Sequence, residues 1–206
     1  MYSNCKEYEY IGKMDFLCYN KTTIEEINKR NINRIYPYAD FIIVTMKGSN
    51  SGVFVFDTTK NLRFVTLETL VPDDPRKISI AFRGFDMYVS LLVTNGQVDV
   101  YQISLEKHVQ KKIKSLKSKA RCSTDIGSSS FEQFVVTIYS KCKNSPPKIT
   151  TYRSTNMEVF TKDIYYPKSS ILGEEDLQGI CMFKKGVLFV AKNSIFFFNR
   201  KNNFFI

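Results

Sequence analysis

The chain has 206 residues, of which 43% are hydrophobic, 14% aromatic and 24% charged, and these fractions exclude a disordered or collagen-like chain. No segment approaches the roughly 18 consecutive apolar residues that a membrane-spanning helix needs, and the N-terminal residues lack the apolar core of a signal peptide. Thirty Lys and Arg against twenty Asp and Glu give a formal net charge of +10, which favours contact with polyanions but also fits a solvated basic surface.

Five short strand-like segments along the chain read alike, and each is followed by a polar turn and a second strand-like segment. They are FLCYN from Phe16, VFVFD from Val53, VDVYQ from Val98, KITTY from Lys148 and SIFFF from Ser194. Their spacing of roughly 45 residues, without long helical periodicity, is typical of a repeated β-architecture.

The segments that precede these anchors are strand-like as well. Before Val98, residues 78–82 alternate and residues 87–94 form an apolar run that ends at Asn95-Gly96, which is a strong hairpin signal. Residues 134–139, 179–183 and 187–191 repeat this pattern before the next anchors. Each unit therefore predicts four short antiparallel strands joined by tight turns.

Repeated four-stranded units predict an all-β, β-propeller-like fold, because stacking such sheets around an axis covers both faces of each sheet. Nearly apolar second strands such as MYVSLLVT suit burial on both faces. We expect one domain over residues 1–206, with four to five blades of four antiparallel strands in an open, incomplete or small closed ring. Its divisions are a partial blade at 1–36 and fuller blades at about 37–74, 75–118, 119–170 and 171–206.

Residues 105–121 allow a second interpretation. Leu105, Val109, Ile113 and Leu116 have helical spacing among seven basic residues, which is typical of a basic amphipathic helix at a membrane surface or an acidic partner. The segment nevertheless lies where the other units place their outer strand, and Val109 and Ile113 also share a strand face. We therefore expect a strand with a basic loop.

Two runs, LQGICMFKKGVLFVAKNSIFFFNRKN and TNGQVDVYQISLEKHVQKKI, resemble the repeats of NHL and WD-like propellers, and more narrowly the C-terminal propeller of tripartite-motif-type proteins. The resemblance covers most of the chain as an architecture. The chain has no Trp, so the WD dipeptide is absent, and Val190-Ala191-Lys192 stands where NHL repeats often have Ala-Asp. The resemblance implies a rigid module whose loops bind a partner, and some NHL propellers bind RNA. RING, B-box and coiled-coil parts are absent, so it implies no ubiquitin-ligase activity.

Residue types that carry enzymatic chemistry are scarce. The single histidine, His108, lies in the basic run, and no Gly-x-Ser-x-Gly, P-loop or Gly-x-Gly-x-x-Gly motif occurs. The acidic clusters Asp73-Asp74 and Glu174-Glu175-Asp176 flank Pro or Gly; they fit solvated loops between blades better than a glycosidase pair. We expect no catalytic residue, no cofactor and no metal.

The cysteines at positions 5, 18, 122, 142 and 181 include no Cys-x-x-Cys pair. This odd, sparse set argues against a disulfide framework or a zinc module and favours a reducing compartment, so we expect a cytoplasmic protein. Cys181, between Ile180 and Met182, is expected to be a small core residue.

The densest basic cluster is the candidate polyanion-binding site. Its members are Lys107, Lys111, Lys112, Lys114, Lys117, Lys119 and Arg121. Lys141, Lys143 and Lys148 follow in the next unit, where Tyr139 and Tyr152 could add stacking surfaces for single-stranded nucleic acid. Alternatively, these lysines keep outer strands soluble and discourage edge pairing.

The sequence thus favours a non-catalytic protein–protein interaction module that presents loops on a propeller. The alternative is RNA binding through a basic face centred on residues 107–121. The partner's identity and the oligomeric state are not indicated.

Overall fold

The computed structural model describes residues 31–47, 52–59, 62–67, 77–93, 96–117, 122–167, 177–199 and 204–205. In these ranges the chain is built of β-strands and turns, so the predicted all-β class is confirmed. None of the described residues belongs to a helix that could span a lipid bilayer. The FLCYN segment and both acidic clusters lie outside the described residues.

The strands form four sheets, each made of four antiparallel strands that follow one another along the chain. The chain divides into two compact units, residues 1–73 and 74–206. The first contains one sheet and the second contains three, and each unit is described by itself.

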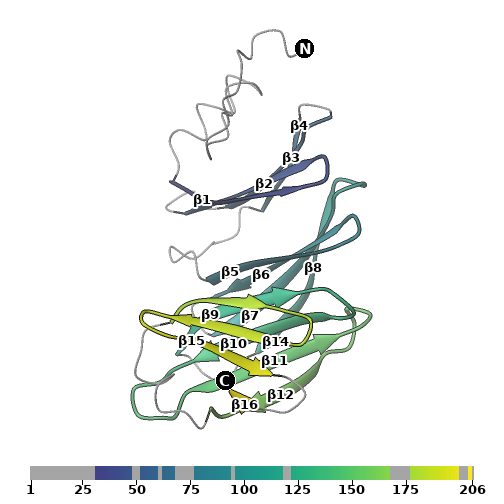
Figure 1. Ribbon diagram of the computed structural model, residues 1–206. Coiled ribbons are helices and arrows are strands. Elements are labelled where there is room, and N and C mark those ends of the chain that lie inside the picture. Colours follow the sequence, from purple (N-terminus) through teal and green to yellow (C-terminus); the bar gives the residue numbers. More distant parts are fainter. Residues whose placement is uncertain are drawn as a thin grey trace. The chain divides into compact units, whose positions relative to one another are not determined.

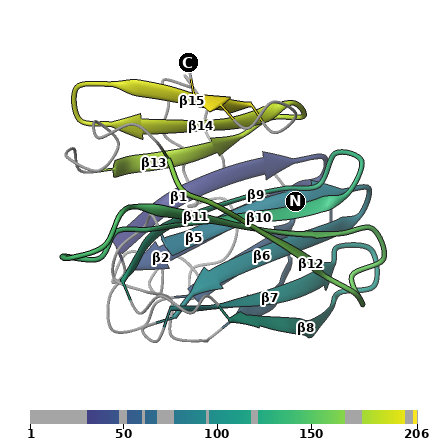
Figure 2. The same ribbon diagram turned by 90° about the horizontal axis from the view of Figure 1, so that it is seen from below.

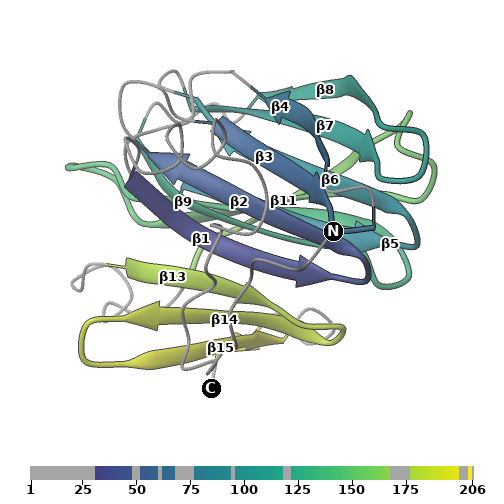
Figure 3. The same ribbon diagram turned by 90° about the horizontal axis from the view of Figure 1, so that it is seen from above.

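The sheet of the first unit has its strands side by side in chain order (Figure 3). They are β1 (Asn31–Tyr38), β2 (Phe41–Lys47), β3 (Gly52–Asp57) and β4 (Leu62–Leu67). Its buried cluster joins Ile42, Val44 and Met46 to Phe54 and Phe56. Strand β1 begins at Asn31, before the expected division at 37. Its Pro37 pairs with Ile42 and is tolerated because β1 is an edge strand of its sheet.

The second unit contains three sheets (Figure 1). The first sheet consists of β5 (Ile78–Arg83), β6 (Asp86–Leu92), β7 (Gln97–Ser104) and β8 (Val109–Lys117). The second consists of β9 (Ser123–Ser129), β10 (Phe134–Ser140), β11 (Lys148–Ser154) and β12 (Thr161–Tyr165). The third consists of β13 (Leu177–Met182), β14 (Gly186–Ala191), β15 (Ile195–Asn199) and β16 (Phe204–Phe205).

The first strands of these three sheets lie against one another, with β9 between β5 and β13. The Ser128 backbone N–H donates to Oγ of Ser79 at 2.8 Å, which ties β9 to β5. A Cβ at Gly127 would lie 2.6 Å from Cγ2 of Ile180, so β9 and β13 approach too closely for any larger residue. Successive sheets that meet through their first strands are the arrangement expected of propeller blades.

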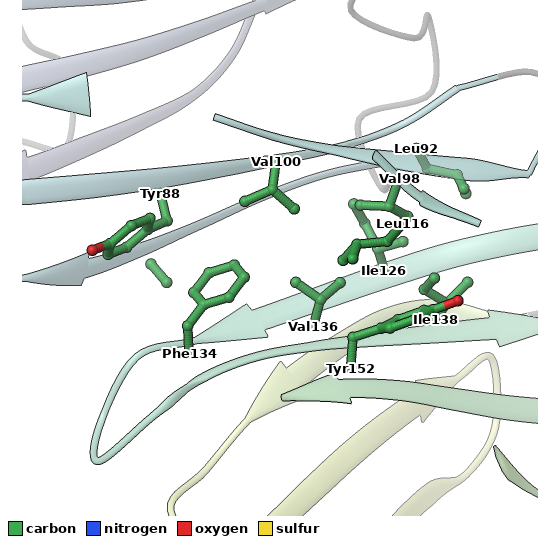
Figure 4. Packing of buried hydrophobic residues seen from close by; sticks show 11 residues of the cluster. Tyr88, Leu92, Val98, Val100, Leu116, Ile126, Phe134, Val136, Ile138 and Tyr152 are labelled. Atoms are coloured by element: carbon green, nitrogen blue, oxygen red, sulfur yellow. The ribbon is translucent and has the colours of Figure 1, made fainter. Parts of the chain in front are cut away.

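Apolar side chains fill the space between the first two sheets of the second unit. Tyr88, Val98, Val100 and Leu116 face Phe134 and other residues of β10 and β11 (Figure 4). All seven residues of β10 are buried, because sheets cover the strand on both faces. The nearly apolar sequence of this second strand was the signal that predicted this position.

Residues 105–108 form a turn, and β8 follows as an extended strand. His108 adopts a positive φ of 56° in this turn. The predicted outer strand is therefore confirmed, and the helical alternative is wrong for residues 109–117. The propensity of Val109 and Ile113 for a strand prevails because β7 supplies a full set of pairing partners from Gln97 to Ser104.

Candidate functional site

A polar cluster holds β7 and β8 together on one face of their sheet. The Asp99 carboxylate accepts hydrogen bonds from Nζ of Lys112, Oγ of Ser115 and Nε2 of Gln97, each at 2.7 Å. Burial by itself would raise the pKa of Asp99, but the hydrogen bonds from Lys112, Ser115 and Gln97 outweigh it, so that pKa lies below its ordinary value. The bond to Asp99 also raises the pKa of Lys112. Lys112 is thus already paired within the chain.

The remaining lysines of the predicted basic cluster do not share one face. Lys111 and Lys114 pair with Gln102 and Val100, on the face that carries Leu116 toward the second sheet. Lys112 and Lys117 lie on the opposite face, since side chains alternate along a strand. Lys107 lies in the preceding turn, and Lys119 and Arg121 lie outside the described residues.

The two tyrosines predicted as stacking surfaces are buried, which overturns that expectation. Tyr139 is 1% exposed and Tyr152 is 6% exposed. Burial raises the pKa of Tyr139 to about 12, and the Tyr152 hydroxyl donates to the backbone carbonyl of Lys117. Both rings belong to cores between sheets, so neither face is open to a base.

Lys141 and Lys143 follow β10, and Lys148 begins β11. The connection between β10 and β11 is the second one of its sheet. Because neighbouring strands are antiparallel, it lies at the end of the strands opposite to the first and third connections. Lys107 belongs to the third connection of its own sheet and therefore lies at the opposite end of the strands from Lys141. Of the described lysines in the candidate cluster, Lys117, at the C-terminal end of β8, lies at the same strand end as Lys141.

Two expectations for the cysteines are corrected by the structure. Cys122 and Cys142 form a disulfide with a Cα–Cα distance of 5.2 Å, because the pairing of β9 with β10 brings residues 20 positions apart together. Cys181 is exposed rather than a core residue. Its neighbours Ile180 and Met182 face Gly127, and alternation along β13 turns Cys181 the other way.

Exposed phenylalanines mark the first turn of each sheet in the second unit. Phe85 is 57% exposed, Phe131 is 61% exposed and Phe183 is 47% exposed. We call these three residues the turn surface. The exposed Val109 begins β8 directly after a third connection, and the exposed Val159 lies in a third connection. Third connections lie at the same strand ends of their sheets as the first turns.

Hydrogen bonds and an ion pair tie these neighbouring turns together. Oγ of Ser130 donates to the carbonyl of Phe82, and Nη1 of Arg83 donates to the carbonyl of Thr155 at 3.3 Å. Nζ of Lys184 lies 2.8 Å from Oε1 of Glu132, and the pKa of Lys184 is raised by that contact. Side chains of the Phe131 turn thus contact both the end of β5 and the Phe183 turn.

A pocket of about 500 Å³ lies where the Phe85 turn meets the beginning of β8. Its lining includes Phe85, Val109, Gln102, Lys107 and Lys111. The lining also includes Asp86 and Glu106, so the pocket combines an apolar wall with two cationic and two acidic side chains. Neither the turn surface nor this pocket was predicted from the sequence. The available signal was a phenylalanine beside a turn residue: Phe85 follows Gly84, and Phe183 precedes Lys184-Lys185.

No group of three or more His, Cys, Asp or Glu side chains capable of holding a metal ion occurs among the described residues. His108 lies in a turn without such a group, and the chain offers no other histidine.

No protein-family model matches the chain, and no curated protein matches it. Solved structures do. A complex of KlAtg21 with the coiled coil of AgAtg16 is 12% identical, with a TM-score of 0.56 over 82% of this chain and 52% of that one. The Swd1 β-propeller domain of Myceliophteria thermophila is 11% identical, with a TM-score of 0.50 over 84% and 55%.

The fission yeast SREBP–SCAP binding domains are 12% identical, with a TM-score of 0.52 over 85% of this chain and 48% of that one. The fold is that of a WD-like β-propeller. The predicted propeller-like architecture is confirmed by this likeness and by the four four-stranded sheets. The chain spans about half the length of the solved structures it matches.

Proposed function

We propose that the protein is a non-catalytic scaffold that binds protein partners through the turn surface. The observation that carries this proposal is the exposed phenylalanine in the same turn of three consecutive sheets. Aromatic residues, phenylalanine among them, are enriched at protein interfaces relative to the rest of the surface. Carried on turns tied together by Ser130, Arg83 and Lys184, they form a preorganised set of apolar anchors.

The similar structures support this function by analogy. The Atg21 propeller is seen in complex with a coiled coil of Atg16, and the SREBP–SCAP structure contains the binding domains of two proteins. Propellers suit such a role because rigid sheets hold loops whose sequences are free to vary. Since the present chain spans only about half of those structures, the analogy is to a mode of binding and not to a particular partner.

The proposal includes a cytoplasmic location, which rests on the sparse cysteines of the sequence. In such a reducing compartment the bond between Cys122 and Cys142 that the structure shows would be opened. It also includes the narrower NHL-type relationship, which rests on the repeat pattern of residues 177–202.

The test compares two triple variants of the full chain. The F85S/F131S/F183S variant removes the turn surface, and the I164S/Y166S/I195S variant removes equally exposed apolar side chains from elsewhere in the second unit. A partner captured by the wild-type chain is purified, and its Kd is measured with each variant. We expect at least about tenfold weaker binding for the first variant, which corresponds to about 1.4 kcal/mol, and unchanged binding for the second. Equal affinity of the two variants would contradict the proposal.

A further inference from the structure

Strand β8 is a long outer strand with an available edge. It has nine residues, against five in β12 and two in β16, and lies at the edge of its sheet (Figure 2). Among the described strands it pairs only with β7. The edge of β8 away from β7 therefore presents a row of backbone donors and acceptors, which can pair with an added strand.

The charge on β8 selects among the strands that could pair with it. Four of its nine residues are lysine, none is acidic, and the lysines are divided between both faces. A basic edge repels another copy of itself and accepts an acidic strand. An added strand also alternates its side chains, so acidic residues on both of its faces would lie opposite Lys111 and Lys114 on one side and Lys117 on the other, where Lys112 is already paired with Asp99.

The pocket of about 500 Å³ adjoins the first residue of β8. Val109 is exposed and lies on the same strand face as Lys111, and Phe85 supplies the facing apolar wall. A large apolar side chain at the matching end of an added strand would cover both residues. The contact of this side chain with the pocket would fix the register of the added strand along β8 and would also strengthen its binding.

We propose that β8 binds an extended acidic segment of a partner protein by strand addition, with one apolar side chain of that segment in the pocket beside Phe85 and Val109. The inference rests on the proposed protein-binding function and gives the partner segment its chemistry. It differs from RNA binding in what it requires. A stacked base needs an open aromatic face, whereas Tyr139 and Tyr152 are buried; an added strand needs only the backbone edge and lysines on both faces.

The test uses fluorescein-labelled twelve-residue peptides and the full chain. The first peptide alternates short runs of Glu and Thr and carries one Phe near one end. The second has the same charge, with Pro in place of the central Thr residues, so that it cannot pair as a strand. The third ligand is a twelve-nucleotide polyuridine. Fluorescence anisotropy is expected to show the Glu-Thr peptide binding at least about tenfold more tightly than the other two ligands.

Matched charge variants locate the contact on β8. The K111E/K114E variant is expected to weaken binding of the Glu-Thr peptide at least about tenfold. The K143E/K192E control changes two exposed lysines outside β8 by the same charge and is expected to leave binding unchanged. Circular dichroism and the thermal midpoint of both variants show whether either is unfolded. A fourth peptide carries Ser in place of the Phe of the Glu-Thr peptide. The wild-type chain should bind the Phe peptide more tightly than the Ser peptide, and a V109D variant should lose this difference.

Amide hydrogen exchange gives a readout specific to strand addition. Residues 109–117 should exchange more slowly with the Glu-Thr peptide and not with the Pro peptide or with RNA. Equal binding of all three ligands would show simple polyanion attraction and overturn the inference, as would absence of peptide binding. If the peptides fail while the F85S/F131S/F183S variant still loses its partner, only the inference about β8 is wrong. If the peptides bind while that variant loses nothing, the assignment of the turn surface is wrong.

Discussion

Asp99 shows how one buried carboxylate stabilises the outer half of a blade. Its side chain joins β7 to β8 through Lys112 and Ser115 and also accepts from Gln97. Replacing Asp99 with Ala leaves these donors without their common acceptor. We expect the D99A variant to lose about 2 kcal/mol of unfolding free energy, the range for hydrogen bonds to a charged group, as measured by urea denaturation at pH 7.

The pH dependence of that loss follows from the lowered pKa of Asp99. A depressed carboxyl pKa contributes stability above the unfolded-state value, near 3.8, and this stability is lost as the pH falls through the folded-state value. The stability difference between wild type and D99A should therefore shrink at pH values below about 4. A difference that stays constant from pH 7 to pH 2.5 would show that the carboxylate's charge plays no part.

Gly127 sets the distance between two neighbouring sheets. A Cβ there would lie 2.6 Å from Cγ2 of Ile180, whereas a Cβ at Gly179 would meet nothing within 4 Å. We expect G127A to lower the unfolding free energy by about 1–3 kcal/mol through overpacking, measured by thermal or urea unfolding. The G179A control should cost clearly less. Equal effects at the two positions would contradict the close approach of β9 and β13.

At the scale of elements, the pairing of β9 with β10 explains a feature that spacing along the chain does not show. Cys122 directly precedes β9 and Cys142 follows β10, and the Lys141 N–H donates to the Cys122 carbonyl at 3.1 Å. The strand register thus brings together two cysteines that look unrelated in sequence. No pattern in the sequence around either cysteine indicates this register.

The disulfide has a measurable consequence for the stability of the purified protein. Closing a 20-residue loop constrains the unfolded chain and is worth about 3 kcal/mol. Reducing the wild-type protein should lower its thermal midpoint, whereas the C122S/C142S variant should have the lower midpoint with or without reductant. A wild-type midpoint that does not respond to reductant would contradict the bond.

Elements were predictable where the pattern is local. The apolar runs that became β6 and β10 were visible in the sequence because strands covered on both faces exclude polar residues. The apolar run of β14 was visible as well, although its burial alternates. Burial of Tyr139 and Tyr152 was not predictable, since it depends on which sheet packs against which. Alternation along a strand already places Lys111 and Lys112 on opposite faces of β8. Which of these two faces Lys114 and Lys117 take was not predictable, because it depends on a bulge at Ile113 in the pairing of β8 with β7.

At the scale of the whole molecule, the repeat was sufficient to predict a propeller. The structure contains four sheets of four consecutive antiparallel strands, which match the repeat in the sequence. The functional surface was not predictable in the same way. Phe85, Phe131 and Phe183 belong to turns of different length and composition. They take equivalent positions because each turn joins the first two strands of its sheet.

The central claim is that protein partners bind the turn surface. The most direct measurement is amide hydrogen exchange on the full chain, with and without a purified partner. We predict protection at residues 84–86, 131–133 and 183–185, the first turns of the three sheets in the second unit. Residues 141–147 and 192–194 are second connections, at the opposite end of the strands. Protection confined to them would contradict the claim.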